Sequence, residues 1–145
     1  DLINEFLEIA RYSLSNITLQ YKEINLTRLL EQLVYEFQPI LDRKGLTCRL
    51  AAADDILLKC DADKMQRVFD NLLRNAVLYS YDGTEIIIEA EQGKDSLVLR
   101  FSNHGGTIPK ERLERIFEQF YRLDTERRSG GTGLGLAIVK NAENL

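Results

Sequence analysis

Apolar residues recur at helical spacing in four stretches of the chain, with polar residues between them. These stretches predict helices at residues 1–14, 26–44, 61–80 and 110–120. Asn25 stands where an N-cap of the second helix is expected, and Asp61 or Asp63 can cap the third. We expect Pro39 to kink or shorten the second helix and Gly45 to end it.

Short apolar runs bounded by turn residues predict strands between these helices. They lie at residues 20–24, 46–51, 56–60, 84–90 and 97–101. The last two are joined by a turn near residues 93–95, which favours a hairpin. Further on, a polar stretch at 124–131 leads into a glycine-bearing segment, and Ala137 to Lys140 are expected to follow it as a helix. Because helices and strands come in blocks without strict alternation, we expect an α+β fold with a mixed or antiparallel sheet and helices on one face.

The composition narrows the class of protein further. The chain has 145 residues, two cysteines and a net charge of −4. This length is typical of one domain that buries its own core, and two cysteines are too few for a disulfide scaffold. No apolar run reaches the roughly 18 residues of a membrane span, and scattered basic residues in an acidic chain argue against a nucleic-acid surface. We therefore expect a soluble cytosolic domain.

Three polar residues follow one another at one-turn spacing along the third predicted helix. Arg67, Asn71 and Asn75 therefore share one stripe beside its apolar face. An asparagine in a helix interior costs about 0.5 to 0.7 kcal/mol relative to alanine, so two of them one turn apart favour a ligand-facing row over a solvated surface. A carboxamide oxygen can ligate Mg²⁺, an ion that shares its shell with water and phosphate.

A second candidate is the glycine-bearing segment from Gly130 to Leu136. Glycines let backbone N–H groups approach an anion, and a helix beginning there adds positive potential. The segment is not a Walker loop, because Leu136 stands where that pattern needs lysine, and it lacks the preceding strand of a dinucleotide fingerprint. A flexible loop is the alternative. Arg122, Arg127 and Arg128 lie close in sequence and can offset the charge of a polyanion.

A third candidate follows the strand predicted at residues 97–101. It reads Asn103-His104-Gly105-Gly106-Thr107-Ile108-Pro109. A carboxamide followed by two glycines suits a polar contact to the edge of a flat ligand while the backbone passes close. We expect His104, the only histidine, to be a loop residue and not a catalyst.

Together these segments resemble the ATP-binding domain of sensor histidine kinases, within the Bergerat (GHKL) ATPase/kinase superfamily. Residues 71–80, 103–109, 116–122 and 131–140 resemble, in that order, its N box, first glycine box, F box and last glycine box. The resemblance implies a two-layer α/β sandwich, here C-terminally truncated, because residues 141–145 do not look like the usual continuation. Residues 3–12 and 120–124 further resemble the VanS vancomycin-resistance sensors. Residues 1–19 would then end a dimerisation and histidine-phosphotransfer helix with its linker, and residues 20–145 would form the catalytic domain.

Carried over residue by residue, the resemblance implies a Mg-ATP site. Asn75 would ligate Mg²⁺, Asn71 would lie by the phosphates, and Tyr79 would pack near the adenine. Asn103 takes the place of the usual aspartate that accepts a hydrogen bond from the adenine amine, and its carbonyl oxygen can still accept. Arg122 would reach the γ-phosphate. The other implied nucleotide contacts are Gly105, Thr107, Ile108, Tyr121, Arg128, Gly131, Thr132, Gly133, Leu134, Gly135 and Leu136.

Asn71 also separates the branches of the superfamily. ATP-hydrolysing and serine-kinase members carry glutamate at this position, as a general base. With asparagine here, the resemblance implies transfer of the γ-phosphoryl group to an imidazole outside this chain, with Asn71, Asn75 and Arg122 as catalytic residues. Two alternatives stay open: an ATPase or serine kinase of the superfamily, and a nucleotide-blind docking module, since Leu78 and Thr107 replace a usual lysine and glycine.

The resemblance also implies partners and a location. ATP and Mg²⁺ are the expected substrate and cofactor, and no nucleic acid is expected to bind. The full-length protein is expected to be a homodimer at the cytoplasmic face of the cell membrane. Its partners would be its own dimerisation and phosphoacceptor domain and a VanR-like response regulator.

Overall fold

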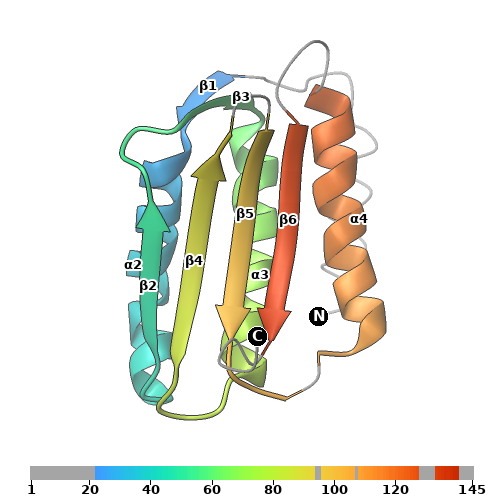
Figure 1. The fold of residues 1–145 in the computed structure, drawn as a ribbon. Helices are drawn as coiled ribbons and strands as arrows, with labels where there is room; N and C mark the ends of the chain where they lie inside the picture. Colours follow the sequence, from blue (N-terminus) through green and yellow to red (C-terminus); the bar gives the residue numbers. More distant parts are fainter. Residues whose placement is uncertain (1–21, 94–95, 107, 128–132, 141–145) are drawn as a thin grey trace.

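The computed structural model describes residues 22–93, 96–106, 108–127 and 133–140, and Figure 1 shows how its helices and strands are arranged. The elements are β1 (Lys22–Asn25), α2 (Leu26–Arg43), β2 (Thr47–Ala52), β3 (Leu57–Cys60), α3 (Ala62–Tyr79), β4 (Glu85–Gln92), β5 (Ser96–Asn103), α4 (Lys110–Arg127) and β6 (Gly133–Lys140). The helix predicted at residues 1–14 and the domain boundary expected at residue 19 lie outside the described residues.

The strands form a mixed sheet of four and a separate pair. The larger sheet has the order β2-β4-β5-β6. In it β2 is parallel to β4, β4 is antiparallel to β5, and β5 is parallel to β6. β1 and β3 pair antiparallel across the top of the view in Figure 1. The β4–β5 hairpin and the mixed sheet are therefore as the sequence predicts.

Helices α2 and α3 cover one face of the larger sheet, and α4 lies next to α3 and β6 (Figure 1). Along β4 and β5, buried side chains such as Ile86 and Phe101 alternate with more exposed ones. The ring of Phe101 packs against Phe69 of α3, with 6.2 Å between ring centroids. The other face of the sheet carries polar pairs, including Arg100 with Glu91 at 3.1 Å. The α+β class with helices on one face is therefore confirmed.

The signals at the helix ends act largely as the sequence predicts. The Asn25 side chain accepts a hydrogen bond from the backbone N–H three residues on, at 3.1 Å, and Asp61 caps α3 in the same way at 3.3 Å. Gly45 follows α2 with a φ of +63°, the left-handed conformation that glycine supplies after a helix. Pro39 does not shorten α2, which continues to Arg43.

Helix α4 is longer than the sequence predicts. It runs from Lys110 to Arg127 and does not end near Phe120. Residues 121–127 contain neither glycine nor proline, so no strong helix breaker interrupts them. The stretch from Asp124, expected to be a polar loop, is therefore helical as far as Arg127.

The helix predicted at Ala137 to Lys140 is wrong. These residues belong to β6, which pairs with β5 from Gly133 to Lys140. In the sequence, Leu134, Leu136 and Ile138 alternate with glycine or alanine, and this two-residue period is that of a strand. Glycines at alternate positions also disfavour a helix. The neighbouring strand β5 supplies the partner that such a pattern needs.

Candidate nucleotide-binding site

Backbone hydrogen bonds join the end of α3, at residues 79–81, to the segment after β5, at residues 104–106. This contact, the α3–β5 junction, holds the first part of the site. The N–H of Gly106 donates to the carbonyl oxygen of Tyr79 at 2.9 Å, and the N–H of Tyr81 donates to that of His104 at 2.8 Å. A Cβ atom on Gly105 would lie 1.8 Å from the Tyr79 carbonyl oxygen. Only glycine therefore allows the two backbones to come this close.

Asn103, the last residue of β5, is buried beside this junction. Its Nδ2 donates a hydrogen bond to Ser80 Oγ at 3.2 Å. The Ser80 hydroxyl in turn donates to the carbonyl oxygen of Ala76, one turn back in α3. The residue predicted to contact adenine is thus tied to the C-terminal turn of the helix that carries Tyr79.

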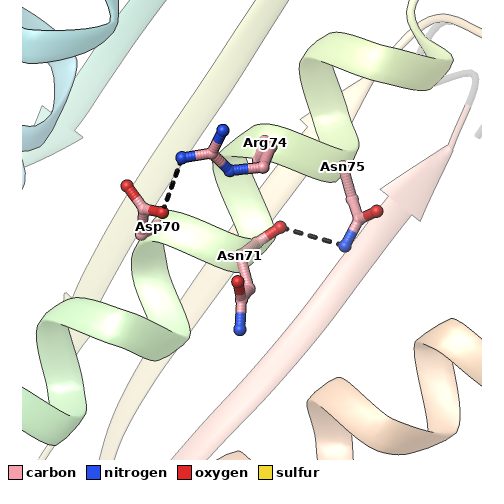
Figure 2. A network of polar contacts seen from close by, with 4 residues as sticks. All are labelled: Asp70, Asn71, Arg74 and Asn75. Atoms are coloured by element: carbon pink, nitrogen blue, oxygen red, sulfur yellow. Dashed lines mark hydrogen bonds and ion pairs between the residues drawn. The ribbon is translucent and has the colours of Figure 1, made fainter. Parts of the chain in front are cut away.

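Asn71 and Asn75 are neighbours one turn apart on α3, as their spacing predicts (Figure 2). Asn75 Nδ2 donates to the backbone carbonyl oxygen of Asn71 at 3.0 Å, which turns Asn75 Oδ1 away from the helix. The Asn71 side chain is exposed and that of Asn75 is half-buried. An anchored carboxamide with its oxygen directed outward fits a Mg²⁺ ion, which prefers oxygen ligands.

Arg112, in the first turn of α4, is a site residue that the sequence did not reveal. Its Nη1 atom lies 3.5 Å from Asn75 Oδ1, and its guanidinium carbon lies 6.0 Å from the centroid of the Tyr79 ring. The two helices are far apart in sequence, so no local pattern marks this contact. The oxygen predicted to bind the metal ion, and the ring predicted to lie near adenine, both face a cation here.

Lys44, which caps the C-terminus of α2, is a second residue that sequence reasoning missed. Its Nζ atom donates to the carbonyl oxygens of Val77 at 2.8 Å and Ser80 at 2.9 Å, and lies 3.4 Å from that of Leu78. The last carbonyl groups of a helix lack partners within the helix and attract positive charge. Lys44 therefore fixes the turn that presents Tyr79.

The acidic residue next to Asn71 is turned away from the Asn71–Asn75 row. Asp70 lies one position earlier, about 100° around the helix. Its carboxylate pairs with Arg74 at 3.0 Å, on another side of α3 from the two asparagines (Figure 2). Arg74 also lies over the Phe37 ring, 5.6 Å from its centroid. The carboxylate nearest to Asn71 in sequence is thus held by a partner and does not face the row.

The remaining predicted site residues fall into three groups. Ile108 is buried just before α4. Tyr121 and Arg122 belong to α4. Thr107, Arg128, Gly131 and Thr132 lie outside the described residues. Gly133, Leu134, Gly135 and Leu136 lie in β6.

The glycine segment at the start of β6 lies far from the α3–β5 junction. Gly133 pairs with Ser96, at the start of β5, whereas Lys140 pairs with Asn103, at its end. Seven residues of strand separate the two ends, or about 23 Å at roughly 3.3 Å per residue. The structure therefore brings together Asn75, Tyr79 and Asn103 through α3 and β5, and leaves Gly133 at the other end of the sheet.

The described part of the chain contains no cluster of three or more histidine, cysteine, aspartate or glutamate side chains that could hold a metal ion. A Mg²⁺ ion at Asn75 would therefore complete its shell with phosphate oxygens and water. Burial, and then the charge of Glu85, raises the pKa of the Cys48 thiol to about 11, so this thiol is protonated at neutral pH. Within the same residues, no helix is long and apolar enough to cross a bilayer.

The fold and the site together define a class of protein. The domain has two layers, and its helix α3 carries two asparagines one turn apart. The end of this helix is hydrogen-bonded to the glycine-bearing segment that follows β5. This arrangement is expected of kinase-type ATP-binding domains. Residues 60–145 match the protein family described as histidine kinase-, DNA gyrase B-, and HSP90-like ATPase. The chain belongs to this family.

Individual relatives agree with this assignment. The sensor protein VanSC of Enterococcus gallinarum is 45% identical over 96% of this chain and 39% of its own length. The sensor protein VanS of Enterococcus faecium is 47% identical over 96% of this chain and 36% of its own length. The chain thus spans less than two fifths of these relatives. The solved structure of full-length ShkA in complex with AMPPNP has a TM-score of 0.68 at 17% identity, over 86% of this chain and 30% of that one, and shows the same fold.

Proposed function

We propose that this chain is the Mg-ATP-binding catalytic domain of a two-component sensor histidine kinase of the VanS type. It would transfer the γ-phosphoryl group of ATP to a histidine outside the chain. The observation that carries this proposal is the α3–β5 junction, which joins Tyr79 and Asn103 at one end of the Asn71–Asn75 row. Eight residues of helix separate Tyr79 from Asn71, or about 12 Å. That length suits a nucleotide whose base lies at the junction and whose phosphates extend along α3.

The base would be held at the junction. Tyr79 offers an aromatic face for stacking, and Asn103 Oδ1 can accept a hydrogen bond from the exocyclic amine of adenine. Asn75 Oδ1 would ligate Mg²⁺, with Asn71 beside the phosphates. Bound there, Mg²⁺ supplies positive charge against the phosphate oxygens. The structure of ShkA with AMPPNP, an ATP analogue, supports ATP as the ligand class of this fold.

The proposed phosphoryl acceptor is an imidazole, because the position that holds a general base in other branches holds Asn71. A carboxamide cannot take up a proton at neutral pH. The neighbouring Asp70 carboxylate is paired with Arg74 and lies on another side of the helix. Water and serine need such a base, whereas an imidazole is already nucleophilic. This chain would then supply position and charge, with Arg122 of α4 as the cation for the γ-phosphate.

The similarity to the sensor proteins VanSC and VanS supports a proposal for partners and location as well. The whole protein would be a homodimeric membrane sensor with this domain at the cytoplasmic face. Its own phosphoacceptor domain, to which residues 1–19 would belong, would receive the phosphoryl group and pass it to a VanR-like response regulator. Its signalling role would be in vancomycin resistance.

A titration with a fluorescent ATP analogue, with and without Mg²⁺, tests the binding half of this proposal. We expect saturable binding that Mg²⁺ strengthens. Asn75→Asp should abolish it, because a carboxylate lacks the Nδ2 donor that anchors Asn75 to Asn71 and repels the phosphates. The matched control is Gln66→Ala, at an exposed position of α3 outside the row, which should bind normally. Absence of binding, or intact binding in Asn75→Asp, would contradict the proposal.

A transfer assay tests the catalytic half. The chain is incubated with γ-labelled ATP and the phosphoacceptor domain of a VanS-type relative. We expect label on that domain with the acid lability and base stability of phosphohistidine. Steady release of phosphate by the chain alone would instead favour the ATPase alternative, and label on a serine would favour the serine-kinase alternative.

A further inference from the structure

A buried chain of hydrogen bonds links Asn103, the residue proposed to face the base, to helix α3. The inference drawn from it rests on the proposed function. Asn103 Nδ2 donates to Ser80 Oγ at 3.2 Å, and the Ser80 hydroxyl donates to the carbonyl oxygen of Ala76. Both Asn103 and Ser80 are buried, with 2% and 4% of their surfaces exposed. Water therefore does not readily replace either partner.

The direction of this chain of hydrogen bonds is fixed from the α3 end. The Ala76 carbonyl oxygen can only accept, so it takes the single hydrogen of the Ser80 hydroxyl. Ser80 Oγ can then only accept from its other neighbour. The group of Asn103 that faces Ser80 must therefore be the donor Nδ2, and the carboxamide oxygen Oδ1 must point the other way.

This orientation distinguishes the two purines. At the same ring position, adenine carries an exocyclic amine that donates, whereas guanine carries a carbonyl oxygen that accepts. A carboxamide can serve either base, since it has both an acceptor and a donor. A carboxamide that is held with Oδ1 toward the base suits adenine and opposes guanine.

We propose that Ser80 is the positioning residue that selects ATP over GTP, by fixing which end of the Asn103 carboxamide faces the base. An aspartate, the residue usual at this position in the superfamily, needs no such device because both of its oxygens accept. In this chain the selectivity depends on a second residue. Without the Ser80 hydroxyl, the Asn103 carboxamide can turn over and offer Nδ2 to guanine.

Competition binding tests the proposal on the full chain. A fluorescent ATP analogue is displaced by ATP or by GTP in the presence of Mg²⁺, and the ratio of the two affinities is compared between variants. Ser80→Ala should lower the preference for ATP by about tenfold, the size of one buried hydrogen bond made or left unmade. Ser80→Thr, which keeps the hydroxyl, should restore the preference.

The Asn103→Asp background supplies the decisive control. A carboxylate presents an acceptor whichever way it turns, so the preference for ATP should be retained there. Adding Ser80→Ala to that background should then leave the ratio unchanged. This difference between the two backgrounds requires that Ser80 act through the orientation of the carboxamide.

Two results would overturn the inference while the proposed function stands. In the first, Ser80→Ala weakens ATP and GTP equally, which is the effect of a merely structural role. In the second, the ratio falls equally in the Asn103 and Asn103→Asp backgrounds. Failure of the wild-type chain to bind either nucleotide is a separate result, which would remove the proposed function and this inference with it.

Discussion

The close approach of Gly105 to the last turn of α3 can be tested by adding one methyl group. In Gly105→Ala the new Cβ would lie 1.8 Å from the Tyr79 carbonyl oxygen, 2.6 Å from its carbonyl carbon and 2.8 Å from Ser80 Cα. All three are backbone atoms of α3 or its C-cap, so the clash cannot be relieved by moving a side chain. The helix end and the end of β5 must separate.

The loss of stability can be estimated from the overpacking and from the hydrogen bonds that the separation strains. Overpacking a tight site costs about 1 to 3 kcal/mol. Separation also strains the hydrogen bonds from Gly106 to Tyr79 and from Tyr81 to His104, each worth about 1 kcal/mol net. We expect Gly105→Ala to lower the free energy of unfolding by about 3 kcal/mol. Since Tyr79 and Asn103 would no longer be held together, binding of the fluorescent ATP analogue should weaken as well.

Urea unfolding followed by circular dichroism measures the first effect, and Gly106→Ala is its matched control. A Cβ at Gly106 meets nothing within 4 Å, and its backbone is not in the left-handed region. That variant should stay within about 0.5 kcal/mol of wild type. If Gly105→Ala also stays within that range, the junction is not built as described, and the reasoning about the site that depends on it fails.

Three further predictions concern Lys44, Arg112 and Cys48. Lys44→Met should lower the free energy of unfolding by about 2 kcal/mol in urea, because a charged donor leaves part-buried carbonyl groups at the end of α3. Arg43→Met, at an exposed position in the last turn of α2, should change it little. Arg112→Ala should lower the Mg²⁺ concentration needed for half-maximal nucleotide binding about two- to threefold, since it removes an exposed cation from Asn75 and Tyr79, while Lys110→Ala should not. Burial first, and the charge of Glu85 second, raise the pKa of Cys48 from 9.0 to about 11. Its contribution to stability is therefore complete below pH 9 and is lost as the pH rises through 11. Between these two pH values, the free energy of unfolding should fall less in Cys48→Ala than in the wild type.

The fold was predictable wherever local pattern and final packing agree. The apolar stripe of α3 and the caps Asn25 and Asp61 are local signals, and they set the bounds of α2 and α3 within one or two residues. The two apolar runs at residues 84–90 and 97–101, with a turn between them, likewise predicted the β4–β5 hairpin. The end of α4 was not predictable in this way, because the polar composition from Asp124 onward is typical of a loop although the residues up to Arg127 contain no strong helix breaker.

The site was predictable only in its local parts. The spacing of Asn71 and Asn75 placed both on one row of α3. The two glycines after Asn103 predicted a close approach of the backbone to a ligand, whereas the close approach in the structure is that of Gly105 to the backbone of α3. The contacts of Lys44 and Arg112 with α3 join residues 33 and 37 positions apart, so they exist only once the helices have packed. No period or spacing in the sequence marks such a contact.

Strand β6 shows that a sequence motif does not by itself determine the conformation of the segment that carries it. A helix was expected only at Ala137 to Lys140, whereas the alternation of Leu134, Leu136 and Ile138 with glycine or alanine suits a strand. Pairing along β5 decides between the two conformations. In that pairing, alternate N–H groups of β6 donate to β5, whereas wrapping a phosphate needs successive N–H groups that point to one place. The phosphate contacts predicted for residues 133–136 therefore require this segment to leave β5. While it stays paired, the proposed function leaves the charge of ATP to be met by the ion proposed at Asn75 and by Arg122, on a chain whose own net charge is −4. Nucleotide binding should for that reason depend steeply on Mg²⁺.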